Sequence, residues 1–287
     1  MGILFDAIAD WFREMLVDGI TANFAGMFDE VNQKAGDIAG QVGQTPAGWN
    51  AGVFNLIRNL GETAVIPIAG MILTFVLCHE LITMVTEKNN LADFDTFNIF
   101  KWIFKTFAAT YILTHTFDIV TGVFALAQQA VNRSAGAISG SLDIDLALTD
   151  LEARLMAMGT GELLGLYLES SILGLAMNAI SLCVFLIIHG RMIEIYLTCS
   201  VAPIPLSTMA NREWGQIGNN YLKSLFALAF QGFLIMVCVA IYAALLQTVT
   251  AGTDIHAALW GLAGYSLLLC FTLFKTGSLS KGLFGAH

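Results

Sequence analysis

The chain has 287 residues, of which 56% are hydrophobic and only 12% are charged, and its formal net charge is −9. Soluble domains carry about 25% charged residues, so this composition argues against a soluble globular protein and predicts a polytopic membrane protein. The acidic balance, with no large basic patch, argues against intrinsic nucleic-acid binding, which needs a positive track. The five cysteines lie in apolar segments without Cys-x-x-Cys spacing, which indicates buried hydrophobic side chains.

The N-terminal region, residues 1–60, is predicted to lie outside the membrane bundle. Residues 3–31 repeat apolar side chains at helical spacing, and the opposite face is acidic. Because amphipathic helices that bind anionic lipid are rich in Lys and Arg, we expect this helix to pack on a partner or a neighbouring subunit. Residues 32–52, rich in Gly, Gln and Asn around Pro46, predict a loop or a frayed helix.

Five apolar segments are close to the roughly 20 residues that cross a bilayer. They are residues 63–85, 102–127, 163–188, 222–249 and 256–274. They predict an all-α polytopic helical membrane bundle over residues 61–277, with a short cytoplasmic tail at 278–287. A polar stretch, 128–161, separates the second and third segments, and Lys101, Trp102 and Lys105 are typical interfacial anchors at the start of the second.

The stretch from His189 to Trp214 is the most unusual part of the chain. It follows the third apolar segment and contains Pro203 and Pro205 within a further apolar run. A membrane helix loses backbone hydrogen bonds at proline, and the freed groups are tolerated only where protein or water covers them. We therefore predict a broken, re-entrant or interfacial segment over 189–214, packed inside the protein.

Counting Lys and Arg predicts the orientation, because cytoplasmic loops carry the excess of these residues. The N-terminal region, the 128–161 stretch and the 250–255 turn form one side, with five basic residues, and the shorter segments on the other side carry eight. This predicts an extracytoplasmic N-terminus and a cytoplasmic C-terminus. If 192–208 crosses completely, the count becomes six and the C-terminus changes side.

Several ionisable residues are expected at membrane depth, where each costs about 2.5–3.5 kcal/mol, and they are functional candidates for that reason. They are His79, Glu80, His115, Asp118 and Glu169, together with Arg191 and Glu194. His115 and Asp118 share a helical face, as a proton relay or metal site would require, but a local hydrogen bond explains the pair equally simply. Arg191 and Glu194 predict an ion pair within one helix, or groups that line a subunit contact or a lumen.

No phosphate loop, nucleophile elbow or paired catalytic carboxylates occur in the sequence, so we predict that the chain is not an enzyme. We also predict no cofactor and no metal site, because metal sites usually group three or four ligands more tightly than this sequence does.

The assembled pattern resembles the TrbL-like polytopic inner-membrane component of conjugation and type IV secretion systems. The resemblance rests on the N-terminal amphipathic region, about five spans, the acidic 128–161 stretch and two short motifs. These motifs read Ala-Pro-Ile-Pro-Leu at 202–206 and Asn-Arg-Glu-Trp at 211–214. The resemblance covers roughly residues 60–275, and the chain is most similar to compact forms in mobile elements of Gram-positive bacteria.

The resemblance implies a non-enzymatic, homo-oligomeric channel or scaffold, with a ring of about five subunits, in the bacterial cytoplasmic membrane. It implies passage of single-stranded DNA with its relaxase, or of protein cargo, without tight binding. Its partners would be other secretion-system membrane subunits, cytoplasmic ATPases and membrane lipid. The candidate subunit-contact or cytoplasmic-mouth residues are Arg191, Glu194, Pro203, Pro205, Arg212 and Trp214.

The alternative function is a secondary transporter or ion channel that uses buried polar side chains beside a broken helix. His115, Asp118 and Glu169 would then form the substrate site. The absence of an internal repeat that relates the two halves of the chain argues against it.

Overall fold

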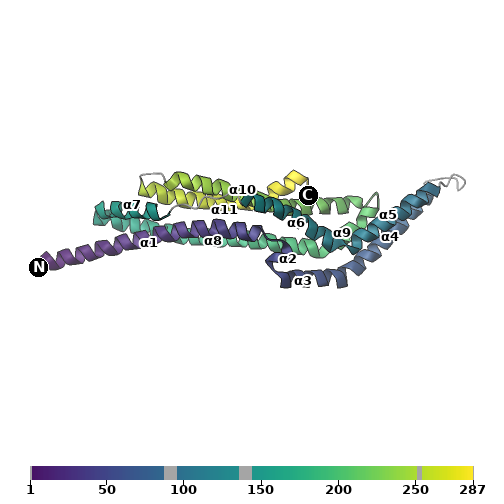
Figure 1. Ribbon diagram of the computed structural model, residues 1–287, viewed down its shortest axis with the longest axis horizontal. Coiled ribbons are helices and arrows are strands. Elements are labelled where there is room, and N and C mark those ends of the chain that lie inside the picture. Colours follow the sequence, from purple (N-terminus) through teal and green to yellow (C-terminus); the bar gives the residue numbers. More distant parts are fainter. Residues whose placement is uncertain (1, 87–95, 136–143, 251–253, 287) are drawn as a thin grey trace. The chain divides into compact units, whose positions relative to one another are not determined.

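The computed structural model describes residues 2–86, 96–135, 144–250 and 254–286, and every regular element in these ranges is helical (Figure 1). The predicted all-α class is confirmed. The elements are α1 (Gly2–Val42), α2 (Pro46–Trp49), α3 (Ala51–Leu60), the π-helical turn η1 (Gly61–Val65), α4 (Ile66–Thr86), α5 (Thr96–Thr114), α6 (Thr116–Ala135), α7 (Ile144–Ala157), α8 (Thr160–Val201), α9 (Pro203–Ser207), the 3₁₀ turn η3 (Thr208–Ala210), α10 (Gly215–Thr250) and α11 (Ile255–Phe284).

Among the described residues, four continuous helical stretches are long and apolar enough to cross a bilayer. They are Ala51–Thr86, Thr160–Ala210, Gly215–Thr248 and Ile255–Phe284. A fifth crossing results if Phe97–Thr114 and Thr116–Arg133, which are bent by 69°, form one span. The count therefore agrees with the predicted number of about five.

The second predicted span, 102–127, is not one straight helix, because the chain bends between α5 and α6 at His115. Threonine hydroxyls here bond back to carbonyls in the preceding turn: Thr116 Oγ1 lies 3.0 Å from Ile112 O and 2.9 Å from Leu113 O. Such back-bonding competes with the helical ladder and often bends helices. The apolar count of this segment does not reveal the bend.

The described chain forms two compact units, and the first contains Met1–Val42, Arg133–Ile188 and Ile235–Lys275. Within it α1 is longer than predicted, since it continues to Val42 through part of the expected loop at 32–52. From Leu16 to Phe28 its apolar face is buried by the chain itself, against α7 and the first part of α8, whereas Ile8, Trp11 and Met15 nearer the N-terminus are exposed. Polar bonds add to this contact: Asn23 Nδ2 donates to Ser170 Oγ at 2.9 Å. The chain itself therefore covers part of this face, and packing of a partner or a neighbouring subunit on the exposed part stays a prediction.

The second unit contains Gly43–Asn132, His189–Leu234 and Thr276–His287. It begins with two short capped helices, of which α2 falls within the stretch predicted as a loop or a frayed helix. Thr45 caps α2, ahead of Pro46 in the first helical turn, and its hydroxyl accepts from the Gly48 amide at 3.1 Å. Asn50 caps α3 in the same way, with its side chain 3.0 Å from the Val53 amide. The Tyr196 hydroxyl of α8 donates a hydrogen bond to Pro46 O at 2.7 Å, which joins the start of α2 to α8.

The proline-containing segment differs in detail from the prediction. Helix α8 continues without a break from 189 to Val201, and the interruption comes only at Ala202, immediately before Pro203. There α9 and η3 form a short, largely buried segment that packs against α4 and α5 (Figure 1). Hydroxyls supply local bonds, with Thr208 Oγ1 donating to Pro205 O at 2.7 Å. Protein thus covers most of this short segment, as a broken helix at membrane depth requires.

Candidate functional site

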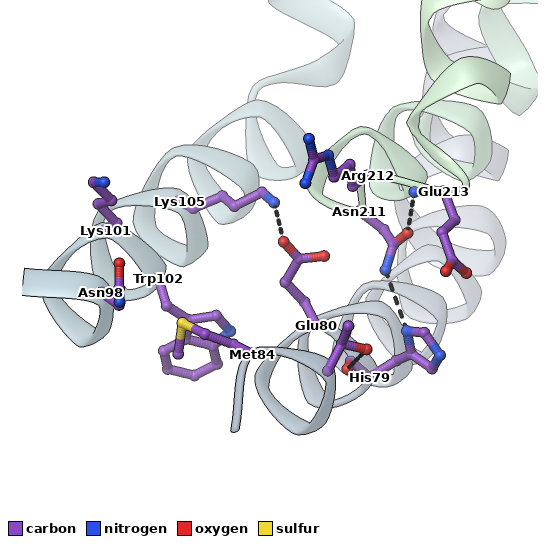
Figure 2. A pocket seen from close by; sticks show the side chains of 11 residues that line it. His79, Glu80, Met84, Asn98, Lys101, Trp102, Lys105, Asn211, Arg212 and Glu213 are labelled. Atoms are coloured by element: carbon purple, nitrogen blue, oxygen red, sulfur yellow. Dashed lines mark hydrogen bonds and ion pairs between the residues drawn. The ribbon is translucent and has the colours of Figure 1, made fainter. Parts of the chain in front are cut away.

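A polar cavity of about 460 Å³ lies in the second unit, where three segments meet (Figure 2). The end of α4, the start of α5 and the turn between η3 and α10 each contribute side chains. The lining residues are His79, Glu80, Thr83, Met84, Asn98, Lys101, Trp102, Lys105, Asn211, Arg212 and Glu213. Their charged and amide groups distinguish this cavity from the apolar surfaces of the same helices.

Two contacts hold α4 and α5 together at the cavity. Lys105 Nζ forms an ion pair with Glu80 Oε1 at 2.6 Å, as Figure 2 shows. Trp102 Nε1 donates to Leu77 O at 3.2 Å, so the indole is fixed by its polar end while its ring stays in the wall. The Lys105 and Glu80 side chains are 37% and 24% exposed. Solvent therefore screens this ion pair, so it contributes little to stability. Its main effect is to hold α4 and α5 in position at the cavity.

Asn211 organises the turn that closes the cavity. Its Oδ1 accepts from the amides of Glu213 at 2.7 Å and Trp214 at 3.1 Å, which is an Asx turn that leads into α10. Its amide nitrogen lies 3.4 Å from Nδ1 of His79 on α4. Asn211 is buried, so its amide is committed to these bonds.

Aromatic stacking joins the same turn to α4. The Trp214 ring stacks on His79 with centroids 5.6 Å apart and on Phe75 with centroids 5.5 Å apart. Offset aromatic pairs of this kind contribute about 0.5–1.5 kcal/mol beyond their burial. Stacking and the Asx turn together give the loop at 211–214 one conformation against α4.

The cavity carries more positive than negative charge. Lys101, Lys105 and Arg212 are opposed by two carboxylates, those of Glu80 and Glu213. The side chains of Lys101 and Arg212 are exposed. These groups can bind an anion by charge and hydrogen bonding. Within the described residues, no group of three or more His, Cys, Asp or Glu side chains could hold a metal ion.

Arg191 and Glu194 do not form the predicted ion pair. Glu194 is exposed and pairs with Lys281 of α11 at 3.0 Å. Arg191 is buried with 6% exposure, and its Nη2 donates to Leu228 O of α10 at 3.3 Å, while its Nε has no hydrogen-bond acceptor in the structure. The i,i+3 spacing was the only signal, and the packing of α8 on α10 and α11 separates the two side chains.

His115 and Asp118 also do not pair. His115 lies at the α5–α6 bend, stacks on Tyr111 with centroids 4.2 Å apart, and has Nδ1 3.1 Å from Tyr111 O. Asp118, in the first turn of α6, is exposed and interacts electrostatically with Arg58. The bend removes the shared helical face on which the predicted pairing depended.

Glu169 lies in the first unit, where it bridges α8 to α11. Its Oε2 lies 2.6 Å from His256 Nδ1, and its Oε1 accepts from Trp260 Nε1 at 2.6 Å. His256 and Trp260 are spaced i,i+4 at the start of α11, a spacing that places two donors on one face. That spacing is a signal the sequence offered, but it does not indicate Glu169 as the acceptor.

The structure therefore brings together four of the predicted residues from two separate groups. His79 and Glu80, expected as buried polar groups, meet Arg212 and Trp214, expected at a cytoplasmic mouth. Pro203 and Pro205 lie in α9 immediately before this turn. The sequence analysis did not identify Asn211 as the residue that holds this turn together. Asn is nevertheless a common turn residue, because its side chain can accept hydrogen bonds from backbone amides two or three residues further along the chain.

Comparison with known proteins identifies one family. The family model described as TrbL/VirB6 plasmid conjugal transfer like protein matches residues 31–203. This match begins earlier than the resemblance seen in the sequence and ends at the first proline of α9. No curated protein and no solved structure matches the chain. Since the matched residues make up more than half of the sequence, the chain belongs to the TrbL/VirB6 plasmid conjugal transfer-like family.

Proposed function

We propose that this chain is a structural channel or scaffold subunit of a conjugation apparatus, assembled from several copies of itself in the bacterial cytoplasmic membrane. Membership of the TrbL/VirB6 family makes it a component of conjugal transfer or type IV secretion, and its apolar helices make it a multi-pass membrane protein. The assembly would help to move single-stranded DNA with its relaxase, or protein cargo, across the membrane.

The family match is the observation that carries this proposal. It extends through the first two candidate crossings and most of the third, so it includes a large part of the membrane region and not only a peripheral segment. The role would be non-enzymatic, with energy supplied by cytoplasmic ATPases. A chain with net charge −9 suits a conduit whose polyanionic cargo must pass without being held.

The turn at 211–214 is the proposed contact at the cytoplasmic mouth. Arg212 and Glu213 are exposed there and can meet another subunit or an ATPase, whereas Pro203 and Arg191 are buried and can only shape the surface. The orientation proposed from Lys and Arg places the end of α4, the start of α5 and this turn on one side of the membrane. Their convergence on one cavity agrees with that placement.

A transporter or ion channel receives less support from the geometry. Its candidate residues do not form one site in either unit: His115 and Asp118 are exposed in the second unit, and Glu169 is bound to His256 and Trp260 in the first.

The first experiment is native mass spectrometry of the protein purified in detergent and in nanodiscs. A closed assembly of several copies, with one defined stoichiometry in both environments, is the expected result. A monomer in both would contradict the homo-oligomeric role and would make ion-flux measurements on Asp118→Asn the next step.

The second experiment measures transfer frequency in a mating assay with the gene deleted and restored in trans. Trp214→Ala should lower transfer by about tenfold or more, because a central aromatic contact is lost, while membrane levels stay unchanged. Trp214→Phe keeps the stacking and should retain transfer, and Ile217→Ala, an exposed neighbour, is the matched control. Normal transfer by Trp214→Ala would remove the turn from the proposed role.

A further inference from the structure

We propose that the cavity between α4, α5 and the 211–214 turn binds the phosphodiester headgroup of an anionic membrane lipid. This inference goes beyond the role in transfer and depends only on the chain's being embedded in a membrane. It joins three features of the described residues: a cavity of suitable size, an excess of cationic side chains and an aromatic surface beside it.

The charges suit one phosphodiester group. Lys101 and Lys105 are spaced i,i+4 on α5 and both line the cavity, with the Lys105 ammonium directed at Glu80 and Lys101 farther along the helix at the cavity's edge. Arg212 extends from the opposite wall, and its guanidinium can hold two phosphate oxygens at once. Because Glu80 already neutralises Lys105 at 2.6 Å, Lys101 and Arg212 are the cations that remain for a ligand (Figure 2).

The surroundings suit an amphiphile. Phe97, Phe100 and Phe104 of α5 are 58%, 68% and 68% exposed, and they follow the helix on the side next to Lys101. The ammonium of Lys101 lies 4.5 Å from the centroid of the Phe97 ring, where the charged and apolar surfaces meet. A lipid can place its phosphate in the cavity and its acyl chains along these rings, with Trp102 at the boundary.

Two observations favour lipid over the phosphates of a DNA strand. The cavity holds the carboxylates of Glu80 and Glu213, which would repel an extended polyanion but leave room for a single charge. The exposed rings beside it belong to α5, within the candidate bent span Phe97–Arg133. Basic pockets between membrane helices on the cytoplasmic side are known to bind anionic headgroups.

The test is lipid titration of the delipidated full-length protein, followed by native mass spectrometry. The probes are dioleoyl phosphatidylglycerol, dioleoyl phosphatidylcholine, free glycerol phosphate and a single-stranded oligothymidylate. We expect phosphatidylglycerol to bind about tenfold more tightly than phosphatidylcholine, because the excess of positive charge in the cavity favours the net negative headgroup. Free glycerol phosphate should bind much more weakly, since it lacks the chains that lie along Phe97, Phe100 and Phe104.

Variants locate the bound lipid. Lys101→Gln and Arg212→Gln should each weaken phosphatidylglycerol binding about fivefold, which corresponds to one surface cation. Arg212→Lys should keep most of the affinity, and Lys223→Gln, an exposed lysine of α10 outside the cavity, is the control for lost charge. All three positions are exposed, so far-UV circular dichroism of the four variants should show unchanged helix content.

Equal binding of the two lipids would overturn the inference, and so would equal losses in Lys223→Gln and Arg212→Gln. Displacement of phosphatidylglycerol by the oligothymidylate would also overturn it, because it would assign the cavity to DNA. Tight binding of glycerol phosphate alone would instead identify a site for a soluble anion and would also overturn it. None of these outcomes depends on mating, so failure here leaves the proposed role in transfer to be judged separately.

Discussion

At the scale of single residues, Arg191 is a buried charge without a close anionic partner among the described residues. It lies within the third candidate span, is 6% exposed, and makes one hydrogen bond at 3.3 Å to a backbone carbonyl that belongs to another helix. Removing a charge from water costs several kcal/mol unless close partners compensate. Its expected partner, Glu194, lies with Lys281 on the exposed surface instead. Burial of the Arg191 charge therefore opposes the stability of the isolated chain.

Replacing Arg191 with Met keeps the length of the side chain and removes the buried charge. We expect Arg191→Met to raise the melting temperature of the detergent-purified protein, with a gain of about 1–4 kcal/mol. Arg191→Ala, which leaves a cavity, should gain less or lose stability. Scanning fluorimetry measures both. A lower melting temperature for Arg191→Met would show that the guanidinium stabilises the protomer.

At the scale of elements, the proline segment is held by close backbone packing on α10. A Cβ at Gly218 would lie 2.1 Å from Met209 Cγ and 2.7 Å from the carbonyl oxygen of Pro205. The first neighbour is a flexible side chain, but the second is backbone and cannot give way without moving α9. A glycine is therefore required at this crossing for packing, not for backbone conformation.

Gly218→Ala should force α9 and α10 apart. We expect a destabilisation of about 1–3 kcal/mol, measured as a lower melting temperature. The matched control is Gly70→Ala on α4, where nothing lies within 4 Å of the added Cβ. That variant should be neutral or gain up to about 1 kcal/mol from helix propensity. Equal effects of the two substitutions would contradict the close approach of α9 to α10.

The first unit offers a direct test of how α8 lies on α11. Cys183 of α8 and Cys270 of α11 lie close enough for their thiols to interact. With the other three cysteines changed to Ser, we expect mild oxidation to join the two helices, provided that the thiols can reach disulfide geometry. A protease site is inserted between α10 and α11, and the oxidised protein is cleaved there. A denaturing gel should then show one band without reductant and two bands with it. The same chain with Cys183→Ser should give two bands under both conditions.

At the scale of the whole molecule, the number of crossings decides which side each terminus faces. Four stretches satisfy the length and hydropathy of a span, and the bent pair α5–α6 supplies a fifth only if it crosses as one unit. Helix α8 has 42 residues, about 63 Å, which is roughly twice the ~30 Å hydrocarbon thickness. Part of α8 must therefore lie outside the hydrocarbon or within the assembly.

Five crossings predict termini on opposite sides of the membrane, with the C-terminus in the cytoplasm. Fusions of green fluorescent protein and alkaline phosphatase after residue 287 should give fluorescence and no phosphatase activity. The same reporters placed before residue 1 should give the reverse. Both termini on one side would mean that the α5–α6 pair enters and leaves on the same face.

The sequence by itself determined the fold class, the approximate number of spans and the family. These follow from the length and frequency of apolar runs and from short motifs, because a bilayer accepts few structures and the constraint acts on contiguous residues. It did not determine where those runs bend or stop: the 69° break at His115 and the continuation of α8 to Val201 depend on hydroxyl back-bonding and on packing.

Only the tertiary structure decided which polar side chains meet. Glu80 pairs with Lys105, 25 residues away in the sequence, and Glu169 pairs with His256, 87 residues away. The local pairs expected between residues 115 and 118 and between residues 191 and 194 did not form. Local spacing can predict a contact within one straight helix. Contacts between helices depend on how each helix rotates about its own axis, and burial of the whole apolar surface sets that rotation.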